Sequence, residues 1–327
     1  MATHKPFRFG AIGGGAESRE EWAELARKVE SLGYATILAG DHPADGGVAP
    51  LAALMAAADA TTMVRLGTHV LANDFRNPVL LAQEATTLDL FSDGRFELGI
   101  GTGWWRDDYT SIGMAYDRPG VRVSRLAEAV SLIKRLFQED SVTYAGSYYN
   151  VQAAQVSPKP AQRPYPPIMI GGGGKRVLSL AAREADIVSL DPIATPEGTK
   201  DLATITAEAL EQQIGWVRAA AGARFDTLEL HNLVFAVAVT DNRQHTAEQL
   251  AEVFAAVPPT MMTNARRSVA EILASVRFLI GTVDQIVEEL LARRERYGIS
   301  YITVIDLPGL PSNIDALGPV VARLTGR

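Results

Sequence analysis

The stretch PPIMIGGGGKRVLSLAAREADIVSL, residues 166–190, contains the pattern that decides the fold. Its apolar run at 168–170 predicts a strand, four glycines follow at 171–174, and residues 174–184 have the spacing of an amphipathic helix. A second apolar run, at 186–190, predicts the next strand. Two such strands joined through a helix run parallel, because a parallel pair needs a crossover connection. The stretch therefore predicts one β–α–β unit.

The alternation of strand and helix continues on both sides of this unit. Eight strands can be counted, each followed by a helix, and their nearly continuous apolar character is typical of strands buried on both faces. The pattern predicts a (β/α)8 barrel with about 75 residues beyond the ~250 typical of that fold. The excess lies in insertions around 138–167 and 240–280, and residues 1–327 are expected to form a single domain. The predicted strands are 7–12, 34–38, 65–71, 95–100, 168–170, 186–190, 228–239 and 301–305.

Between these strands, the sequence predicts a few further elements. Thr282 and Gln285 are spaced as a capping box, which marks the start of a helix. Residues 200–221 are interpreted as one long helix, and residues 247–278 as a helix broken near two prolines. A hairpin is predicted at 142–151.

Composition excludes several classes of protein. The chain has 327 residues, a formal net charge of −7, 47% apolar and 21% charged residues, and no cysteine. These are ordinary globular values, so disordered and fibrous classes are excluded. The lack of cysteine excludes zinc ribbons, thiolate nucleophiles, iron–sulfur clusters and redox dithiols. The acidic balance argues against nucleic acid or an anionic membrane as a partner. Any chemistry is therefore expected to depend on a cofactor.

No segment of the sequence resembles a leader or a membrane span. The longest uncharged stretch, at 49–58, is about half the ~20 residues needed to cross a bilayer. The protein is therefore expected to be cytoplasmic. No spacing of His, Asp and Glu resembles a metal site, so no metal is expected.

The four-glycine run after the fifth predicted strand is the strongest functional signal. Active sites of (β/α)8 barrels lie on the loops that follow the strands. The free backbone N–H groups and the dipole of the following helix favour an anion there, and two cations follow directly. The spacing fits neither a P-loop nor a dinucleotide fingerprint, because Arg176 and Val177 occupy the positions that those motifs require. A flexible helix-capping loop is the alternative. The predicted phosphate-binding residues are Gly171, Gly172, Gly173, Gly174, Lys175 and Arg176.

Polar and aromatic residues follow three other strands. His42 and Asp41 form the only acid–imidazole pair at a predicted strand end, and they are candidates for proton transfer or for a structural pair. His69 lies inside the third strand, where it serves either core packing or a cofactor wall. Trp104 and Trp105 are costly to expose, so they either cover a ring-shaped ligand or pack under the barrel rim.

A glycine cluster after the first strand raises the alternative of a Rossmann fold. Gly13 and Gly15 match the start of its fingerprint, but Ser18 stands where a third Gly or Ala is needed. Asp41, the next acidic residue at a strand end, also lies further along the chain from the glycines than the residue that binds the ribose in a Rossmann fold. The barrel is therefore favoured.

Six segments near the predicted strand ends together carry a family pattern. They are ILAGDHP at 37–43, LGTHVLAN at 66–73, NPVLLAQEATTLDLFSDGRFELGIGTGW at 77–104, RPGVRVSRLAEAVSLIKRLF at 118–137, PPIMIGGGGKRVLSLAAREADIVSL at 166–190 and GTVDQIVEELLARRERYGISYITV at 281–304. As a set they resemble the luciferase-like monooxygenase superfamily, specifically its actinobacterial branch of oxidoreductases that depend on the deazaflavin coenzyme F420. The resemblance is weakest around 195–280.

The resemblance implies a barrel that holds a flavin or deazaflavin ring at its carboxyl-terminal mouth. His42 and Asp41 are the implied catalytic residues, and a non-prolyl cis peptide at His69–Val70 is implied to support the ring. The glycine run is implied to bind the cofactor phosphate. The implied cofactor-binding residues are Asp41, His69, Val70, Asn73, Gly103, Gly171, Gly172, Gly173, Gly174, Lys175 and Arg176.

The implied reaction is hydride transfer between F420 and an unidentified small organic substrate. An FMN-dependent luciferase-like monooxygenase and a non-catalytic flavin-binding relative are the alternatives. Members that oxidise sugar phosphates carry a Glu where this chain has Trp104, which argues against glucose-6-phosphate as substrate and favours an apolar pocket lined by Trp104 and Trp105. A homodimer is expected, with the small-residue helix at 51–60 packed against the partner. The alanines of that stripe are Ala52, Ala53, Ala56 and Ala57.

Overall fold

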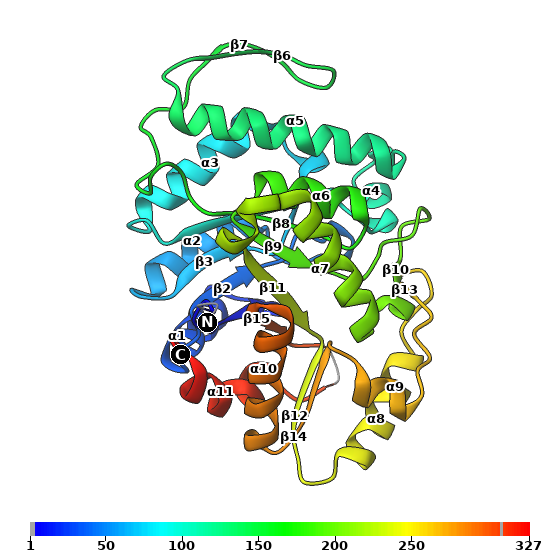
Figure 1. The fold of residues 1–327 in the computed structure, drawn as a ribbon. Coiled ribbons are helices and arrows are strands. Elements are labelled where there is room, and N and C mark those ends of the chain that lie inside the picture. The colour runs from blue at the N-terminus through cyan, green and yellow to red at the C-terminus, as the bar shows by residue number, and fades with distance from the viewer. Residues whose placement is uncertain (1–3, 308–309) are drawn as a thin grey trace.

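A computed structural model describes residues 4–307 and 310–327. Parallel strands form a closed barrel, and helices surround it (Figure 1). The barrel strands are β1 (Arg8–Gly13), β2 (Thr36–Ala39), β3 (Arg65–Thr68), β4 (Leu71–Ala72), β5 (Phe96–Gly101), β8 (Ile168–Gly172), β9 (Ile187–Leu190), β11 (Glu229–Val234) and β15 (Ile299–Ile305). Their order is β3-β2-β1-β15-β11-β9-β8-β5-β4, and an additional pairing of β3 with β5 closes the ring. The structure confirms the predicted (β/α)8 barrel, with β3 and β4 sharing one position.

The helices occupy the predicted places between the strands. Thr282 and Gln285 form the expected capping box, since each side chain accepts a hydrogen bond from the backbone N–H of the other residue. The helices are α1 (Arg19–Ser31), α2 (Pro50–Ala60), α3 (Pro78–Phe91), α4 (Arg106–Ser111), α5 (Pro119–Gln138), α6 (Lys175–Glu184), α7 (Ala207–Ala221), α8 (Arg243–Ala255), α9 (Val269–Ala274), α10 (Val283–Tyr297) and α11 (Asn313–Leu324).

Two insertions extend the barrel, as expected, and they lie on opposite sides of the molecule in Figure 1. The first is the hairpin of β6 (Val142–Ala145) and β7 (Asn150–Ala154). Its turn is held by the Glu128 carboxylate of α5, which accepts backbone hydrogen bonds from Ser147 and Tyr148 at 2.9 Å. The second insertion joins α8 and α9 to β12 (Ala236–Val239) and β14 (Phe278–Gly281), a separate parallel pair with its own buried apolar cluster.

The sequence interpretation was wrong in three segments of the second half. The apolar run at 228–239 is two strands, because the barrel uses only 229–234 and the remainder pairs with β14. Residues 200–221 are not one helix: α7 begins after Thr206, whose side chain caps it. Phe278, expected to end the helix at 247–278, is instead the first residue of strand β14. Before α7, Lys200–Asp201 (β10) pairs with Met262–Thr263 (β13). In each case a partner strand far away in the chain overrides the local pattern.

A charged cluster closes the amino-terminal end of the barrel. The buried Glu97 carboxylate accepts from Arg8 Nη1 at 2.6 Å and from Arg65 Nε at 2.5 Å. Arg8 also pairs with Glu229 at 2.7 Å. Burial alone would raise the pKa of Glu97, but the two arginines outweigh burial and hold it below its usual value. These charges are paired at the end of the barrel opposite the loops that follow the strands.

Candidate active site

His42 follows β2 at the carboxyl end of the barrel, and its ring is held by a residue of another loop. Its Nδ1 lies 2.8 Å from Oδ2 of Asp108, in the first turn of α4. Oδ1 of Asp108 accepts a hydrogen bond from the backbone N–H of Ala44 at 3.1 Å. Asp108 is nearly fully buried, whereas 34% of the His42 side chain is exposed. Among the described residues nothing is hydrogen-bonded to Nε2 of His42, so this nitrogen is available for proton exchange with a ligand.

The two tryptophans after β5 lie against the His42 ring. The ring centroids of Trp104 and Trp105 are 5.6 and 5.8 Å from that of His42, and the two indoles stack on each other. Trp105 is 8% exposed and packs under the rim, whereas Trp104 is only partly buried. The ammonium of Lys200 lies 5.3 Å from the centre of the Trp104 ring, and burial lowers the pKa of Lys200. At the carboxyl-terminal end of the barrel, a histidine ring, an indole face and a cation therefore lie next to one another.

Asp41 is engaged within the chain. Its carboxylate forms two hydrogen bonds with the Arg76 guanidinium, at 2.6 and 3.0 Å, and accepts from the backbone N–H of Ala72 at 2.9 Å. The side chain is 6% exposed. Asp41 thus ties the loop after β2 to β4 and stabilises the segment that carries Asn73.

The inner wall of the mouth is built from His69 and Val70, whose peptide bond is cis, as the resemblance implied. A Cβ added at Gly101 would lie 2.8 Å from Val70 Cγ2, and one at Gly171 would lie 3.3 Å from the same side chain. The glycines of β5 and β8 therefore make room for Val70. The His69 ring lies at 4.9 Å from His231, and burial lowers the pKa of His69.

Asn73 is 2% exposed and lies beside the β6–β7 hairpin. Its side-chain amide donates to the Tyr149 hydroxyl at 3.2 Å and to Asp74 Oδ1 at 3.4 Å. Asp74 in turn pairs with Arg125 of α5 at 2.8 Å. These contacts connect the first insertion to the mouth of the barrel.

The glycine run connects β8 to α6 and leaves the helix start uncapped by any side chain. A Cβ at Gly173 would lie 2.5–2.7 Å from backbone atoms of the 191–193 loop, so a glycine is needed there. At Gly174, by contrast, nothing lies within 4 Å of the added Cβ. Gln213 holds the arrangement together, since its Nε2 donates to the carbonyls of Gly173 and Asp191. The uncapped backbone N–H groups and the open space at Gly174 fit an anion.

The two cations after the glycines behave differently. Lys175 is exposed, and among the described residues it makes no ion pair. Arg176 donates to the Gly120 carbonyl at 3.0 Å and to Ser124 Oγ at 2.7 Å, which ties α6 to α5. The ammonium of Lys175 is therefore open to a ligand, whereas two of the Arg176 N–H groups are hydrogen-bonded within the protein.

The loop at 102–104 is held by Arg122 of α5. Arg122 is 2% exposed, and its guanidinium donates to the carbonyls of Thr102 and Gly103 and, at 2.9 Å, to the Tyr116 hydroxyl. Tyr116 donates to the Trp104 carbonyl at 2.7 Å. Gly103 has φ +69, and a Cβ there would collide with the Tyr109 ring. This clamp fixes the backbone from which both tryptophans project.

Four residues of this arrangement were missed by sequence reasoning. Asp108 follows the tryptophans without any motif, and Lys200 was assigned to a helix. Arg122 belongs to a regular helical pattern, and His231 lies within a predicted strand with no motif around it, although its ring contacts His69. Only His231 carried a usable signal, because it sits on the inward-facing register of a barrel strand.

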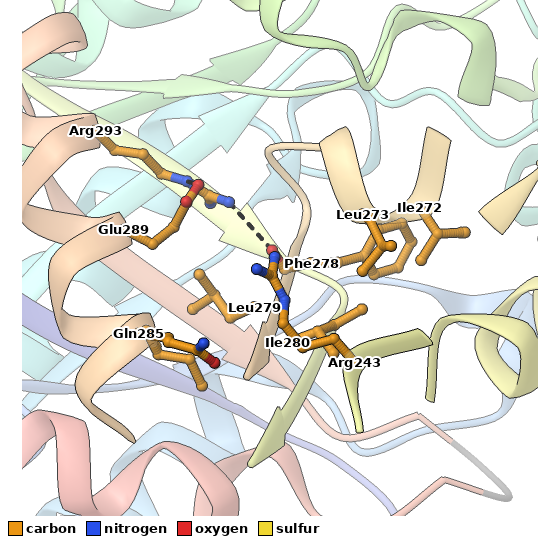
Figure 2. A pocket seen from close by; sticks show the side chains of 10 residues that line it. Arg243, Ile272, Leu273, Phe278, Leu279, Ile280, Gln285, Glu289 and Arg293 are labelled. Carbon is orange, nitrogen blue, oxygen red and sulfur yellow. Dashed lines mark hydrogen bonds and ion pairs between the residues drawn. The ribbon is translucent and has the colours of Figure 1, made fainter. Parts of the chain in front are cut away.

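Two cavities lie away from the mouth of the barrel, and the larger, of about 300 Å³, is an open hollow between α3 and residues 156–158. The smaller, of about 40 Å³, lies outside the barrel between α10 and β14, beside the hydrogen bond of Arg293 to the Phe278 carbonyl at 3.1 Å (Figure 2). That volume has room for one or two water molecules. Among residues 4–307 and 310–327, no three His, Asp or Glu side chains are placed to hold a metal ion. In the same ranges no helix is long and apolar enough to span a bilayer.

The family model described as luciferase-like monooxygenase matches residues 2–300. The chain belongs to this family. Solved structures agree on the luciferase-like fold: an F420-dependent secondary alcohol dehydrogenase with an F420–acetone adduct aligns with a TM-score of 0.77 and 19% identity, over 98% of this chain and 99% of that one. The F420-dependent tetrahydromethanopterin reductase of Methanopyrus kandleri gives a TM-score of 0.75 at 18% identity, over 97% of each chain.

Curated members of the luciferase-like family match in sequence as well. An F420-dependent glucose-6-phosphate dehydrogenase of Amycolatopsis mediterranei is 35% identical over 170 residues, 50% of each chain. The enzyme of that name from Kineococcus radiotolerans is 37% identical over 171 residues, again 50% of each. An FMNH2-dependent dimethylsulfone monooxygenase of Pseudomonas putida is 25% identical over 183 residues, 56% of this chain and 47% of that one. The chain thus spans about half the length of the curated relatives it matches.

Proposed function

We propose that the protein is an oxidoreductase that transfers a hydride between coenzyme F420 and a small organic substrate. The observation that carries the proposal is the convergence of His42, held by Asp108, with the His69–Val70 wall and the open glycine run at one end of the barrel. The relatives that are 34–37% identical and named as F420-dependent enzymes support F420 as the cofactor.

The residues of the mouth fit a ring cofactor with a phosphate-bearing tail. Gly172, Gly173 and Gly174 would hold the phosphate with backbone N–H groups, and Lys175 would add its charge. His69, Val70 and Asn73 would line the ring. When bound, F420 supplies the ring carbon that accepts or donates a hydride. The protein supplies orientation, the wall of the pocket and the proton.

We assign proton transfer to His42. Asp108 accepts from Nδ1 of His42 and so directs Nε2 toward the substrate. Oxidation of a substrate alcohol removes a hydride from its carbon and a proton from its hydroxyl oxygen; Nε2 would take that proton, and would return it in the reverse direction. Asp41 has both carboxylate oxygens bound to Arg76 and is proposed to position the neighbouring loop, without transferring protons itself.

The substrate side of the mouth is apolar where sugar-phosphate enzymes carry a carboxylate. Trp104 occupies that place, with Lys200 behind its ring. We therefore propose a substrate other than glucose-6-phosphate, with an apolar portion that packs on Trp104. The specific compound is left to a substrate screen with F420.

The second candidate is an FMN-dependent monooxygenase, favoured by the similarity to the dimethylsulfone enzyme. A glycine run that binds one phosphate serves either cofactor. Titration of the purified protein with F420 and with FMN, followed by fluorescence, separates the two. Micromolar binding of F420 and none of FMN is expected, and the reverse result would overturn the proposal.

Two variants at one position test the phosphate site. Gly174→Asp places a carboxylate at the start of α6 without a steric clash, because nothing lies within 4 Å of the added Cβ. It is expected to weaken cofactor binding at least tenfold through charge repulsion, while Gly174→Ala keeps wild-type affinity. Asp is also a good helix N-cap, so the fold should persist. Equal affinities of the two variants would refute the assignment.

We further propose a homodimer whose interface includes α3 and not only the predicted alanine stripe at 51–60. Ala53 and Ala57 of the predicted stripe are buried inside the chain, whereas Ala52 is exposed and Ala56 is partly buried, so only half of the stripe is open to a partner. The adjacent α3 also exposes Leu80 (56%) and Phe91 (70%). Light scattering at micromolar concentration is expected to give twice the chain mass, and Phe91→Glu to give the monomer; a monomeric wild type would refute this.

A further inference from the structure

Four polar side chains from four barrel positions form a chain of hydrogen bonds beneath the mouth. Thr303 Oγ1 of β15 lies 2.7 Å from Nε2 of His231 on β11. Nδ1 of His231 lies 2.9 Å from Oγ of Ser189 on β9, and the same Oγ lies 3.3 Å from Nε2 of His69. Ser189, His231 and Thr303 are each fully buried. The chain ends at the residue proposed to line the cofactor ring.

The buried surroundings favour the neutral form of both rings. Burial lowers the pKa of His69 and lowers that of His231 well below its usual range. The charged and titratable groups that act on the two rings are Asp191, Lys200, His42, Arg8 and Arg277. The Tyr301 ring packs edge-on against His231 at 4.7 Å. A neutral imidazole has one N–H donor and one acceptor nitrogen, so its tautomer decides what each nitrogen can bind.

The single hydrogen of the Ser189 hydroxyl couples the two tautomers. If His231 carries its proton on Nδ1, Ser189 accepts there and donates to Nε2 of His69, which then carries its own proton on Nδ1. If His231 carries its proton on Nε2, the chain reverses and His69 also carries its proton on Nε2. An arrangement in which Ser189 accepts from both rings would leave a buried hydroxyl donor unpaired, which is unfavourable. The two histidines must therefore share one tautomer.

We infer that Ser189 and His231 are positioning residues that orient His69 and couple its tautomer to that of His231, so that the state of His231 decides whether Nδ1 of His69 offers a donor or an acceptor to the bound ring. Neither residue lies at the rim of the mouth, and both act through His69. The consequence for the cofactor rests on the proposed function, whereas the shared tautomer is a property of the protein alone.

The test of the shared tautomer compares two serine variants in the barrel. Ser189→Ala removes the link between the histidines, while Ser300→Ala removes an equally buried hydroxyl that has no hydrogen-bond partner. Imidazole nitrogen NMR of the unliganded protein reports each tautomer directly. In wild type and Ser300→Ala, His69 and His231 should show the same tautomer; in Ser189→Ala, His69 should become a mixture. Different tautomers in wild type, or an unchanged His69 in Ser189→Ala, would overturn the inference.

Thr303→Val is the second variant, in case Ser189→Ala fails to fold. It keeps the side-chain shape and removes the partner of His231 Nε2, so the two directions of the chain, both of which the Thr303 hydroxyl can satisfy, are no longer balanced as in wild type. The tautomer populations of His231 and His69 should then change together, although Thr303 does not touch His69. Unchanged signals would count against the coupling.

Cofactor titration then separates the two proposals. If wild type binds F420, Ser189→Ala should bind it about fivefold more weakly, as expected for one hydrogen bond, and Ser300→Ala should bind like wild type. Equal affinities in all three would refute the positioning role and leave the proposed function standing. Binding of neither F420 nor FMN by wild type would refute the proposed function, while the NMR result still decides the shared tautomer.

Discussion

Substituting alanine at Gly173 tests how closely the glycine run packs on the next loop. The added Cβ would lie 2.5 Å from the Asp191 carbonyl oxygen, 2.6 Å from that of Pro192 and 2.7 Å from the Ile193 nitrogen. All three are backbone atoms, which cannot rotate away as a side chain does. Gln213 also pins the two segments together through its bonds to Gly173 and Asp191. The loop must therefore shift as a unit.

The size of the effect follows from two opposing contributions. Overpacking of this kind costs about 1–3 kcal/mol. Replacing Gly by Ala also restricts the unfolded chain, which stabilises the fold by about 0.4–1 kcal/mol. Gly173→Ala should therefore lower the free energy of unfolding by about 1–2 kcal/mol. Gly174→Ala has open space and an ordinary φ of −85, so it keeps only the stabilising contribution.

Urea unfolding of the two variants beside wild type provides the measurement. Their difference should be about 1–3 kcal/mol, which for a chain of this length corresponds to a melting temperature about 1.5–4.5 °C lower in Gly173→Ala than in Gly174→Ala. Because the shifted loop carries Asp191, cofactor affinity should fall in Gly173→Ala and stay at the wild-type value in Gly174→Ala. Equal stabilities for the two alanine variants would refute the close packing described here.

Three other perturbations have defined outcomes. Glu97→Gln removes the buried carboxylate shared by the partly buried Arg8 and Arg65, leaving Glu229 to pair with Arg8 alone, and should destabilise the barrel by about 3 kcal/mol, measured by urea unfolding; a change below about 1 kcal/mol would contradict the role of the cluster. Both buried histidines have a pKa below that of the unfolded chain, so unfolding takes up protons and stability should fall as pH drops below about 6.5. The two histidines together contribute at most about 2.7 kcal/mol per pH unit to this slope, His231→Gln should remove up to about half of that ceiling, and an identical slope would refute the assignment. Asp108→Asn should lower kcat about 10–100-fold by removing the charge that orients His42, with little change in cofactor affinity; a wild-type rate would exclude the pair from catalysis.

The location of the candidate site could be predicted because the active site of a (β/α)8 barrel lies on the loops that follow its strands. Once eight apolar strands alternate with helices, the residues just after them must meet at one end of the barrel. His42, Val70 and the run at Gly173 could therefore be placed together from sequence, and the structure does bring them to one mouth. The side chains that hold them could not be placed this way, because Asp108 follows no motif and the helical patterns that contain Arg122 and Lys200 do not specify which distant groups these side chains contact.

Local patterns along the chain are enough to predict the barrel, its two insertions and the family. These depend on periodicity, on turn residues and on motifs within single segments. The contacts between side chains of distant segments, by contrast, are known only from the folded structure. Asp41 with Arg76, His42 with Asp108, and His69 with His231 through Ser189 each join segments that closure of the barrel brings together. A hydrogen bond needs its partners within about 3 Å, and no local pattern specifies that contact before the strands close.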